Sequence, residues 1–396
     1  MKAILILVSL FLLHIPVKSQ NMSHDHLKKT LDTLEKIESA AYREYSCSWE
    51  PGDTVAVRGN SFIMEFNNPA DSTIGATLRR YDGIDTTRLE FLYDGDRKAS
   101  IYHKEKGAIV DDFTVRRLPF RLVTPPFFNY AKNIVRYALE TNDSIDVDLE
   151  DLGDEYHFKL VIHEEEQVEF FGKAYIIPKN PYMLDPTSIY ELWIRKSDGL
   201  PYKVRREMSH NISESVCSDV TLNQLQSGGF TVDDYIPQGY EVRKYGEKSN
   251  KKTDSGLIGK KAPDWSLKDM NEQTVSLSGL KGKVVVVGLT GIGCGPCLAS
   301  IPFLNKLKKD FSAEKFELVV IETWKRNTYS LQNYAQKHHI EYTFLSGNED
   351  IVKNYQTPAV PVFFILDRES IVRKVINGYA LEKTDQEIAE AIRKLL

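Results

Sequence analysis

The sequence is poor in several features that define whole classes of protein. It has only four cysteines in 396 residues, which excludes a small scaffold held together by disulfides. It has no excess of positive charge, with 51 Lys and Arg against 56 Asp and Glu, which argues against a nucleic-acid binder. It has no low-complexity tracts, and 42% of its residues are hydrophobic, enough for a sizeable core. What remains is a globular, slightly acidic chain that is too long for one ordinary domain.

Beyond its first residues, the chain has no apolar stretch of the roughly 20 residues that cross a bilayer. Near the N-terminus, Lys2 supplies a positive charge, residues 3–13 form an apolar run, and Pro16 interrupts the segment. Small or modest residues follow at the positions that a signal peptidase reads, which predicts a signal peptide over residues 1–19. The alternative is an uncleaved membrane anchor, for which the run is short. We therefore expect an exported protein, soluble in the periplasm or outside the cell, where disulfides can persist.

A change in composition near residue 250 predicts a boundary between two domains. Residues 244–256 are polar, lack aliphatic side chains and end in glycine, as expected of a linker. Residues 257–396 carry 19 basic and 16 acidic side chains, whereas residues 20–256 carry a net charge of −10. We therefore predict one domain over residues 20–243 and a second over residues 257–396.

The region before the linker has the pattern of a sheet with one or two helices. Apolar residues at helical spacing open it, and a second helix is expected over residues 126–139; the first set is Leu27, Leu31, Leu34, Ile37 and Ala41. Apolar and polar residues then alternate over residues 89–93, 156–162 and 202–205, as in strands with one buried face. Asp-Gly pairs at 94–95 and 198–199 favour hairpins. These patterns predict a mostly antiparallel sheet, of α+β class, that packs its apolar face against the helices.

The opening helix and the strand, turn and returning strand from Tyr190 to Val204 resemble the half-barrel fold of the LolA and LppX lipoprotein carriers. The resemblance spans about residues 22–235 and rests on the pattern of elements. It implies a β half-barrel with a concave apolar surface able to hold a lipid, another hydrophobic ligand or a protein segment. The alternative is that the aromatic residues of this region only fill a core.

The strongest chemical signal is the sequence Cys294-Gly295-Pro296-Cys297. It follows the β-branched run at residues 284–287, typical of a buried parallel strand, and it precedes a helical pattern at residues 298–307. Cys294 should therefore lie at a helix N-terminus, where unpaired amide groups and the helix dipole favour its thiolate. Cys297, one turn further on, is more shielded. We interpret Cys294 as the attacking thiolate and Cys297 as the resolving thiol.

Two alternative interpretations of the cysteine pair are a zinc half-site and an inert disulfide. A structural zinc site needs four ligands, and the sequence has no second Cys pair or nearby Cys and His cluster to supply them. An inert disulfide does not need the context of strand, turn and helix. We therefore predict a redox-active dithiol and no metal site.

Residues 257–396 resemble the TlpA/ResA family of exported thiol-disulfide oxidoreductases, which has the α/β thioredoxin-like fold. The segments that carry the resemblance fall in family order; they are Ile258–Leu267, Val275–Val284, the Cys pair, and Ala359–Asp367. The resemblance implies that Pro361 is a cis-proline whose loop packs beside the sulfurs, although an isolated Val-Pro is more often an ordinary turn. It also implies that Val360, with Gly293, Gly295 and Pro296 beside the cysteines, contacts a substrate chain.

Three positions depart from the pattern of this family. Gly293 stands where the family usually has Trp, and Ser300 and Gly288 stand where relatives commonly have an acidic or polar residue. A buried carboxylate could accept the proton of the resolving thiol, so these departures leave the base unassigned. Glu322 and Trp324 follow the next strand-like run and could line the site, but a solvated strand-end charge is the more common role for a residue like Glu322.

The remaining cysteines are Cys47 and Cys217, both in the first predicted domain. An oxidising compartment permits a structural disulfide between them, although sequence alone does not say whether their Cα atoms come within about 7 Å. If both are free instead, they could exchange disulfides with the Cys294 pair.

The leading hypothesis for function is an exported thiol-disulfide oxidoreductase that reduces protein disulfides. No cofactor motif is visible, so the electron donor should be another protein, and the family resemblance implies a membrane-embedded thiol carrier. A peroxidase of the peroxiredoxin kind is a second possibility, but it needs Thr three residues before its reactive Cys, where this chain has Gly291. A third is a carrier or adaptor for a hydrophobic or protein ligand, served by an accessory redox domain.

Overall fold

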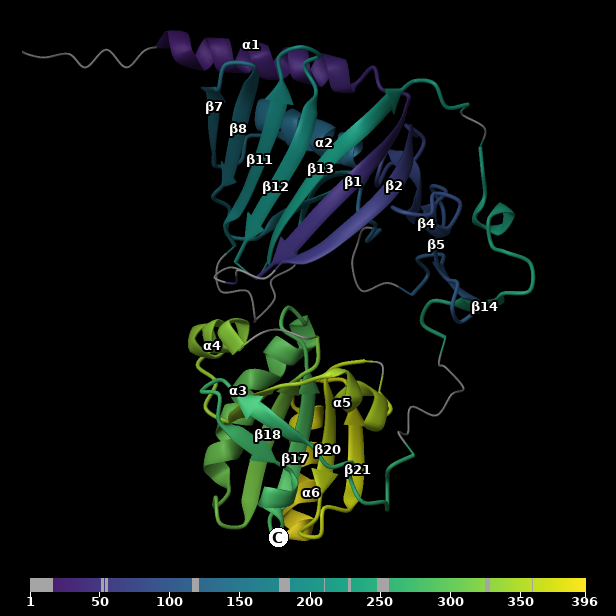
Figure 1. Ribbon diagram of the computed structural model, residues 1–396. Coiled ribbons are helices and arrows are strands. Elements are labelled where there is room, and N and C mark those ends of the chain that lie inside the picture. The colour runs from purple at the N-terminus through teal and green to yellow at the C-terminus, as the bar shows by residue number, and fades with distance from the viewer. Residues whose placement is uncertain are drawn as a thin grey trace, which may run out of the picture.

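The structure is a computed structural model that describes residues 17–50, 53, 56–115, 121–177, 186–209, 211–226, 229–247, 256–324, 328–357 and 359–396. The predicted signal peptide lies outside the described residues except for positions 17–19, and residues 248–255 of the predicted linker lie outside them as well. The described residues form two large β-sheets, one from strands within residues 39–244 and one from strands within residues 266–377 (Figure 1).

The first sheet has twelve strands, in the spatial order β14-β6-β5-β4-β3-β2-β1-β13-β12-β11-β8-β7. All neighbours are antiparallel except β14 and β6, so the predicted antiparallel sheet is confirmed. Within the described residues the sheet is open, with β14 and β7 at its edges. The strands are β1 Ser39–Trp49, β2 Val57–Asn67, β3 Ala76–Asp82, β4 Leu89–Tyr93, β5 Lys98–Tyr102, β6 Gly107–Asp111, β7 Ile145–Asp151, β8 Glu155–Ile162, β11 Ser188–Arg195, β12 Pro201–Met208, β13 Asn211–Leu222 and β14 Glu241–Lys244.

Two helices cover one face of this sheet, α1 (Val17–Leu34) and α2 (Phe127–Glu140). The predicted second helix is confirmed, and both helices bury apolar side chains in one core with β1, β8, β11 and β12. The first helix was expected to extend its apolar face to Ala41, and this is wrong. Ala41 lies in β1, paired with Met64 and Thr221 on the two neighbouring strands, because the helix ends at Leu34.

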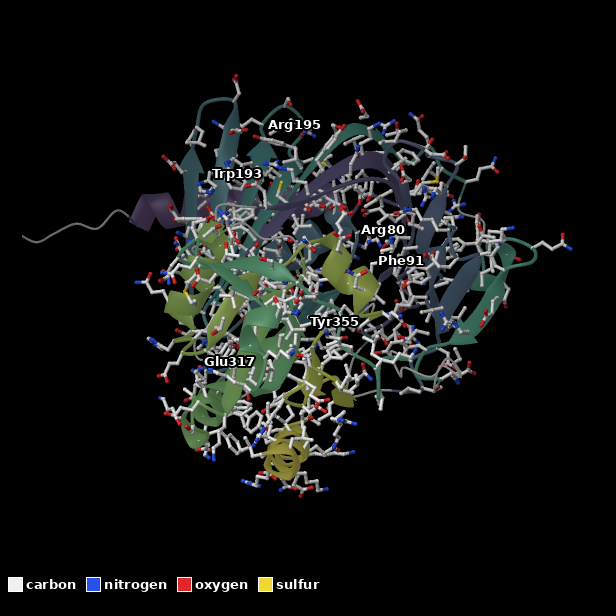
Figure 2. The ribbon with its side chains drawn as sticks, turned by 60° about the horizontal axis from the view of Figure 1, so that its bottom comes forward. Arg80, Phe91, Trp193, Arg195, Glu317 and Tyr355 are labelled. Carbon is white, nitrogen blue, oxygen red and sulfur yellow. A yellow bond between two sulfur atoms is a disulfide. The ribbon has the colours of Figure 1, made fainter. Side chains whose placement is uncertain are left out.

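Alternation along the strands separates a helix-covered face from an outer face. On β11, Tyr190, Leu192 and Ile194 are buried in the core. Trp193, which is labelled in Figure 2, alternates with these residues and therefore lies on the opposite face. Its ring stacks on that of His157, with 4.6 Å between the centroids. Both predicted Asp-Gly turns join antiparallel neighbours, β4 to β5 and β11 to β12. A separate hairpin of β9 (Val168–Phe171) and β10 (Lys173–Ile176) packs against α2, and a short 3-10 helix, η1, spans Val232–Asp234.

The second sheet has seven strands, in the order β16-β15-β19-β18-β17-β20-β21. The central strands β17, β18 and β19 are parallel, and β20 is antiparallel to β17. Every residue of β17 is buried, as predicted for its β-branched run. The strands are β15 Ser266–Asp269, β16 Thr274–Ser276, β17 Val284–Thr290, β18 Phe316–Glu322, β19 Thr343–Ser346, β20 Val362–Leu366 and β21 Val372–Asn377.

Helices cover both faces of the second sheet. The side chains of β17 point alternately to the two faces, so they contribute to two separate apolar cores. Val284 and Val286 face a core that contains residues of α3, α4 and α6, whereas Val285 and Val287 face one that contains residues of α5 and the segment before β15. This arrangement is the thioredoxin-like α/β fold that was predicted. The helices are α3 Gly295–Asp310, α4 Thr328–Lys337, α5 Glu349–Asn354, α6 Lys383–Leu395 and the 3-10 helix η2 Ser278–Leu280.

Candidate active site

The two cysteines of the Cys-Gly-Pro-Cys sequence lie where β17 turns into α3. Cys294 is the N-cap residue of the helix, and its sulfur accepts a hydrogen bond from the backbone N–H of Cys297 at 3.3 Å. The pair forms a disulfide, with Cα atoms 5.2 Å apart. An amide donor and the positive end of the helix dipole both act on the Cys294 sulfur, and both stabilise a thiolate there when the disulfide is reduced.

The two sulfurs differ in their access to solvent. Cys294 is 8% exposed and Cys297 is 2% exposed, in the order expected for an attacking and a resolving thiol. Gly293, Gly295 and Pro296 around Cys294 are exposed. Gly293 has a φ of +90°, a conformation that residues with a Cβ rarely adopt, so its place in the turn favours glycine over the Trp of the family.

The loop before β20 lies against the attacking cysteine. The Val360–Pro361 peptide bond is cis, which confirms the prediction for Pro361. The Val360 carbonyl oxygen lies 3.9 Å from the Cys294 sulfur, and the Pro361 carbonyl accepts a hydrogen bond from Gly378 N–H at 2.7 Å. The residues predicted from the resemblance therefore come together around one sulfur.

Glu322 is fully buried, so its expected place as a solvated strand-end charge is wrong. Its Oε1 accepts hydrogen bonds from the backbone N–H groups of Ile292, at 3.3 Å, and Trp324, at 3.0 Å. The carboxylate thus binds the loop that leads to Cys294. Ser300, where relatives have an acid, donates its hydroxyl proton to the Cys297 carbonyl at 2.7 Å. No sequence signal indicates the burial of Glu322, because that burial depends on the pairing of β18 with β17 and β19, which are remote along the chain.

Cys47 and Cys217 are both free, so the structural disulfide considered for them is not formed. They lie on the adjacent strands β1 and β13, but Cys47 is paired with Glu214 and Cys217 with Glu44. The two cysteines are therefore three positions apart along the ladder, and an odd offset places their side chains on opposite faces of the sheet. Burial raises the pKa of the Cys217 thiol to about 12, which makes exchange with the Cys294 pair unfavourable.

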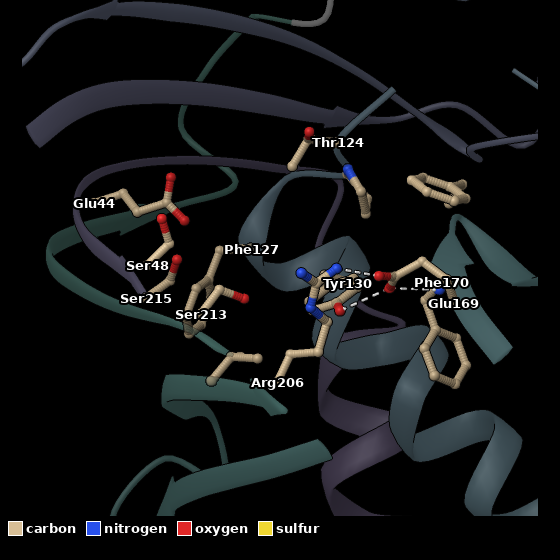
Figure 3. A pocket seen from close by; sticks show the side chains of 13 residues that line it. Glu44, Ser48, Thr124, Phe127, Tyr130, Glu169, Phe170, Arg206, Ser213 and Ser215 are labelled. Carbon is tan, nitrogen blue, oxygen red and sulfur yellow. Dashed lines mark hydrogen bonds and ion pairs between the residues drawn. The ribbon is translucent and has the colours of Figure 1, made fainter. Parts of the chain in front are cut away.

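A second candidate site is a cavity of about 430 Å³ in the N-terminal region, between the sheet and the start of α2 (Figure 3). One wall carries Glu44 and the hydroxyls of Ser48, Ser213 and Ser215. The other carries aromatic rings and an ion pair between Arg206 and Glu169, which also accepts a hydrogen bond from Tyr130 at 3.0 Å. The lining is therefore mixed, rather than the apolar surface that was expected.

Neither metal binding nor a membrane helix is evident in the part of the chain that the structure describes. No group of three or more His, Cys, Asp and Glu side chains there is arranged to hold a metal ion. None of the helices described is both long and apolar enough to span a membrane.

Residues 257–392 match the family model described as Redoxin. Thiol-disulfide oxidoreductase ResA of Bacillus thuringiensis is 24% identical over 139 residues, 35% of this chain and 78% of the relative. Thioredoxin-like protein YneN of Bacillus subtilis is 26% identical over 127 residues, 32% of this chain and 74% of the relative. A solved structure of a putative thiol:disulfide interchange protein DsbE from Chlorobium tepidum is 26% identical, with a TM-score of 0.32, and covers 34% of this chain and 97% of its own.

The match to the family and the geometry of the cysteines agree. The family covers the second sheet and its helices, and the curated relatives are similar to about a third of the chain. The residues matched by the family model include the features described above: the buried parallel strand β17, the N-capping Cys294 and the cis-proline loop. The C-terminal region is therefore a Redoxin domain of thioredoxin-like fold, and the chain is a thiol-disulfide oxidoreductase.

Proposed function

We propose that this chain is an exported protein disulfide reductase, with a domain boundary in residues 244–256 and a signal peptide over residues 1–19. The main observation is the position of Cys294. It is the more exposed cysteine and the N-cap of α3, so it acts as the attacking thiolate in this proposal. The Cys-Gly-Pro-Cys sequence resembles that of thioredoxin, which is strongly reducing at about −270 mV.

In the proposed reaction the reduced Cys294 thiolate attacks one sulfur of a client disulfide. A bond forms between Cys294 and that sulfur, and the other client sulfur leaves as a thiolate and takes a proton. The Cys297 thiolate then attacks the Cys294 sulfur, which releases the second client thiolate and forms the Cys294–Cys297 disulfide. Two electrons pass from the dithiol to the client, so a thiol donor must reduce the domain again. By family analogy this donor is a membrane-embedded thiol carrier.

The N-terminal region contacts the redox domain beside the candidate site, and we propose that it presents the client. The Glu50 carboxylate, 8% exposed, lies 3.2 Å from His338 Nε2 and 3.7 Å from Lys337 Nζ at the end of α4. Asp53 accepts a hydrogen bond from the Ser330 hydroxyl at 2.7 Å. The same crevice is lined by Ile292, two residues before Cys294. In Figure 1 the ends of β1 and β13 are turned toward α4.

A specific observation favours a second role for the N-terminal region, as a half-barrel that holds a ligand or a protein segment. The cavity beside α2 has about the volume of a small-molecule site, with aromatic rings and a few polar groups. We test it with Ser215→Trp, which would fill the cavity from β13. Loss of binding or reduction of a client protein, with reduction of a small disulfide retained, would support the role. Equal activity on both would argue against it.

The test of the main proposal is the redox midpoint of each cysteine. Differential alkylation and mass spectrometry of the full chain, across a series of thiol and disulfide buffers, should give the Cys294–Cys297 pair a midpoint near or below about −250 mV. A midpoint of about −120 to −180 mV would indicate an oxidase or isomerase instead. A pair that does not cycle would exclude the enzyme and leave the ligand site as the functional part.

A further inference from the structure

A large aromatic side chain lies exposed beside the candidate active site. Trp324 follows the end of β18, and it is 50% exposed, whereas Trp265 in the same region is 6% exposed. Tryptophan is enriched at the centres of protein interfaces, because it buries a large area and loses little conformational entropy on binding.

The indole rests on the turn that carries Cys294. A Cβ placed on Gly291 would lie only 2.5 Å from Cδ2 and 2.6 Å from Cε2 of Trp324, so the ring occupies space that only glycine leaves. The Gly291 carbonyl accepts a hydrogen bond from the Cys294 N–H at 3.1 Å. The residue beneath the indole and the attacking cysteine are therefore the two ends of one closed turn.

The backbone of Trp324 is fixed to the same loop. Glu322 Oε1 accepts from both Trp324 N–H and Ile292 N–H, and Thr323 N–H donates to the Thr290 carbonyl at 2.9 Å. Because Glu322 is fully buried, its hydrogen bonds to Ile292 and to Trp324 are both shielded from water. The indole is thus preorganised relative to Cys294, which lowers the entropic cost of binding against it.

The described residues that flank Cys294 in sequence carry no charge. Gly293, Gly295 and Pro296 are exposed, and Val360 lies beside the sulfur on the cis-proline loop. These uncharged residues, and the indole that rests on Gly291, offer apolar surface on the turn that carries Cys294, which suits an apolar side chain better than a charged one. An extended client segment held at Val360 would place a side chain flanking its cysteine on this surface.

We propose that Trp324 is a specificity-determining residue that binds an aromatic or aliphatic side chain next to the client cysteine. This assignment rests on the proposed reductase function and names its preferred substrate, a disulfide flanked by an apolar residue. The contact forms before the thiolate attack and persists in the mixed disulfide, so it affects substrate binding and leaves the chemistry of the two sulfurs unchanged.

The test uses the full chain and three disulfide probes. Two are synthetic peptides with an internal disulfide, identical except for Phe or Ser beside the cysteine that is attacked, and the third is hydroxyethyl disulfide. The variants are Trp324→Ala, Trp324→Phe and Gly291→Ala, which displaces the indole without removing it. Trp193→Ala, on the outer face of the N-terminal sheet, is the matched control.

We expect wild type to prefer the Phe peptide, and Trp324→Ala to lower kcat/KM for it by about tenfold, mainly through KM. Gly291→Ala should act in the same direction, Trp324→Phe should retain most of the preference, and Trp193→Ala should change nothing. In the two Trp324 variants, activity on the Ser peptide and on hydroxyethyl disulfide should stay within about twofold of wild type, and the redox midpoint of the cysteines within about 9 mV, which is the same twofold change converted at about 29.6 mV per tenfold.

Three results would overturn the assignment. These are an unchanged preference in Trp324→Ala, an equal loss on all three probes, and a shifted midpoint, since the last two would mean that the indole acts on the cysteines themselves. A wild-type protein that reduces none of the probes would instead overturn the reductase function, and the assignment with it.

Discussion

The two cysteine pairs of this chain differ in their state, because the pair in the C-terminal region forms a disulfide and the pair in the N-terminal region is free. In the C-terminal region, Cys294 and Cys297 are brought together by one turn of helix, and the first of them receives an amide hydrogen bond. In the N-terminal region, Cys47 and Cys217 lie on neighbouring strands but on opposite faces of the sheet. The difference teaches that backbone placement, rather than proximity of strands or cysteine count, decides which thiols can react.

The two regions also differ in where they bury charge. In the N-terminal core, Glu65 accepts hydrogen bonds from the Tyr42 hydroxyl at 2.7 Å and from two backbone N–H groups that begin α2. In the C-terminal region, Glu322 binds the loop before Cys294. The Glu65 carboxylate thus binds the start of a helix, and the Glu322 carboxylate binds an active-site loop. Each region can therefore be tested by substituting its own buried carboxylate.

The largest expected effect is on the reactive pair. Replacing Cys294 with Ser should lower disulfide reduction by roughly a thousandfold or more, because the nucleophile is lost. The measurement is turnover of hydroxyethyl disulfide by the full chain. Cys47→Ser is the control and should stay within about twofold of wild type. A comparable loss of turnover in both variants would contradict the conclusion that only the Cys294 pair reacts.

Alkylation of the native protein should separate the two free thiols. With the Cys294–Cys297 disulfide intact, iodoacetamide at pH 8 should modify Cys47 roughly a hundredfold faster than Cys217. The reason is that burial raises the pKa of the Cys217 thiol to about 12, which leaves almost no thiolate. Peptide mapping by mass spectrometry over time gives both rates. Similar rates would mean that the β1–β13 ladder opens readily.

The buried carboxylate of the N-terminal core predicts a pH-dependent stability. Burial raises the pKa of Glu65 from 4.5 to about 7, so the folded protein binds more protons than the unfolded chain between these values. The free energy of unfolding should therefore fall by about 3 kcal/mol as pH rises from 4.5 to 7, and level off above 7. Urea denaturation at several pH values measures it.

The matched variant for this prediction is Glu65→Gln, which keeps an accepting oxygen and cannot ionise. The difference in unfolding free energy between wild type and this variant should change with pH over the interval from 4.5 to 7. A difference that does not vary with pH would show that the pKa of Glu65 is the same in the folded and the unfolded chain.

The carboxylate of the C-terminal region should have a smaller effect on stability. Replacing Glu322 with Ala leaves the N–H groups of Ile292 and Trp324 without their acceptor, which should cost about 1–3 kcal/mol. Glu322→Gln retains an acceptor and should cost less. Thermal or urea unfolding of the full chain distinguishes the two, and an Ala variant as stable as wild type would exclude the tie between the loop and Trp324.

Local patterns predicted much of the fold and the centre of the site. The β-branched run before Cys294, the helical spacing after Cys297, and the two Asp-Gly hairpins each depend on neighbours within a few residues, so the structure matches them closely. The helix expected to reach Ala41 failed for a related reason. Ile37 and Ala41 continue the helical spacing, but pairing of β1 with strands far along the chain converts Ala41 to a strand residue.

By itself, then, the sequence determined the strand, turn and helix that present Cys294, and the resemblance that pointed to the cis bond before Pro361. Only the tertiary structure decided that Glu322 is buried, that Cys47 and Cys217 face apart, and that Trp324 rests on Gly291. The physical reason is distance along the chain. Backbone preferences and helix ends act over a few residues, whereas burial, strand register and side-chain packing arise only when remote segments meet.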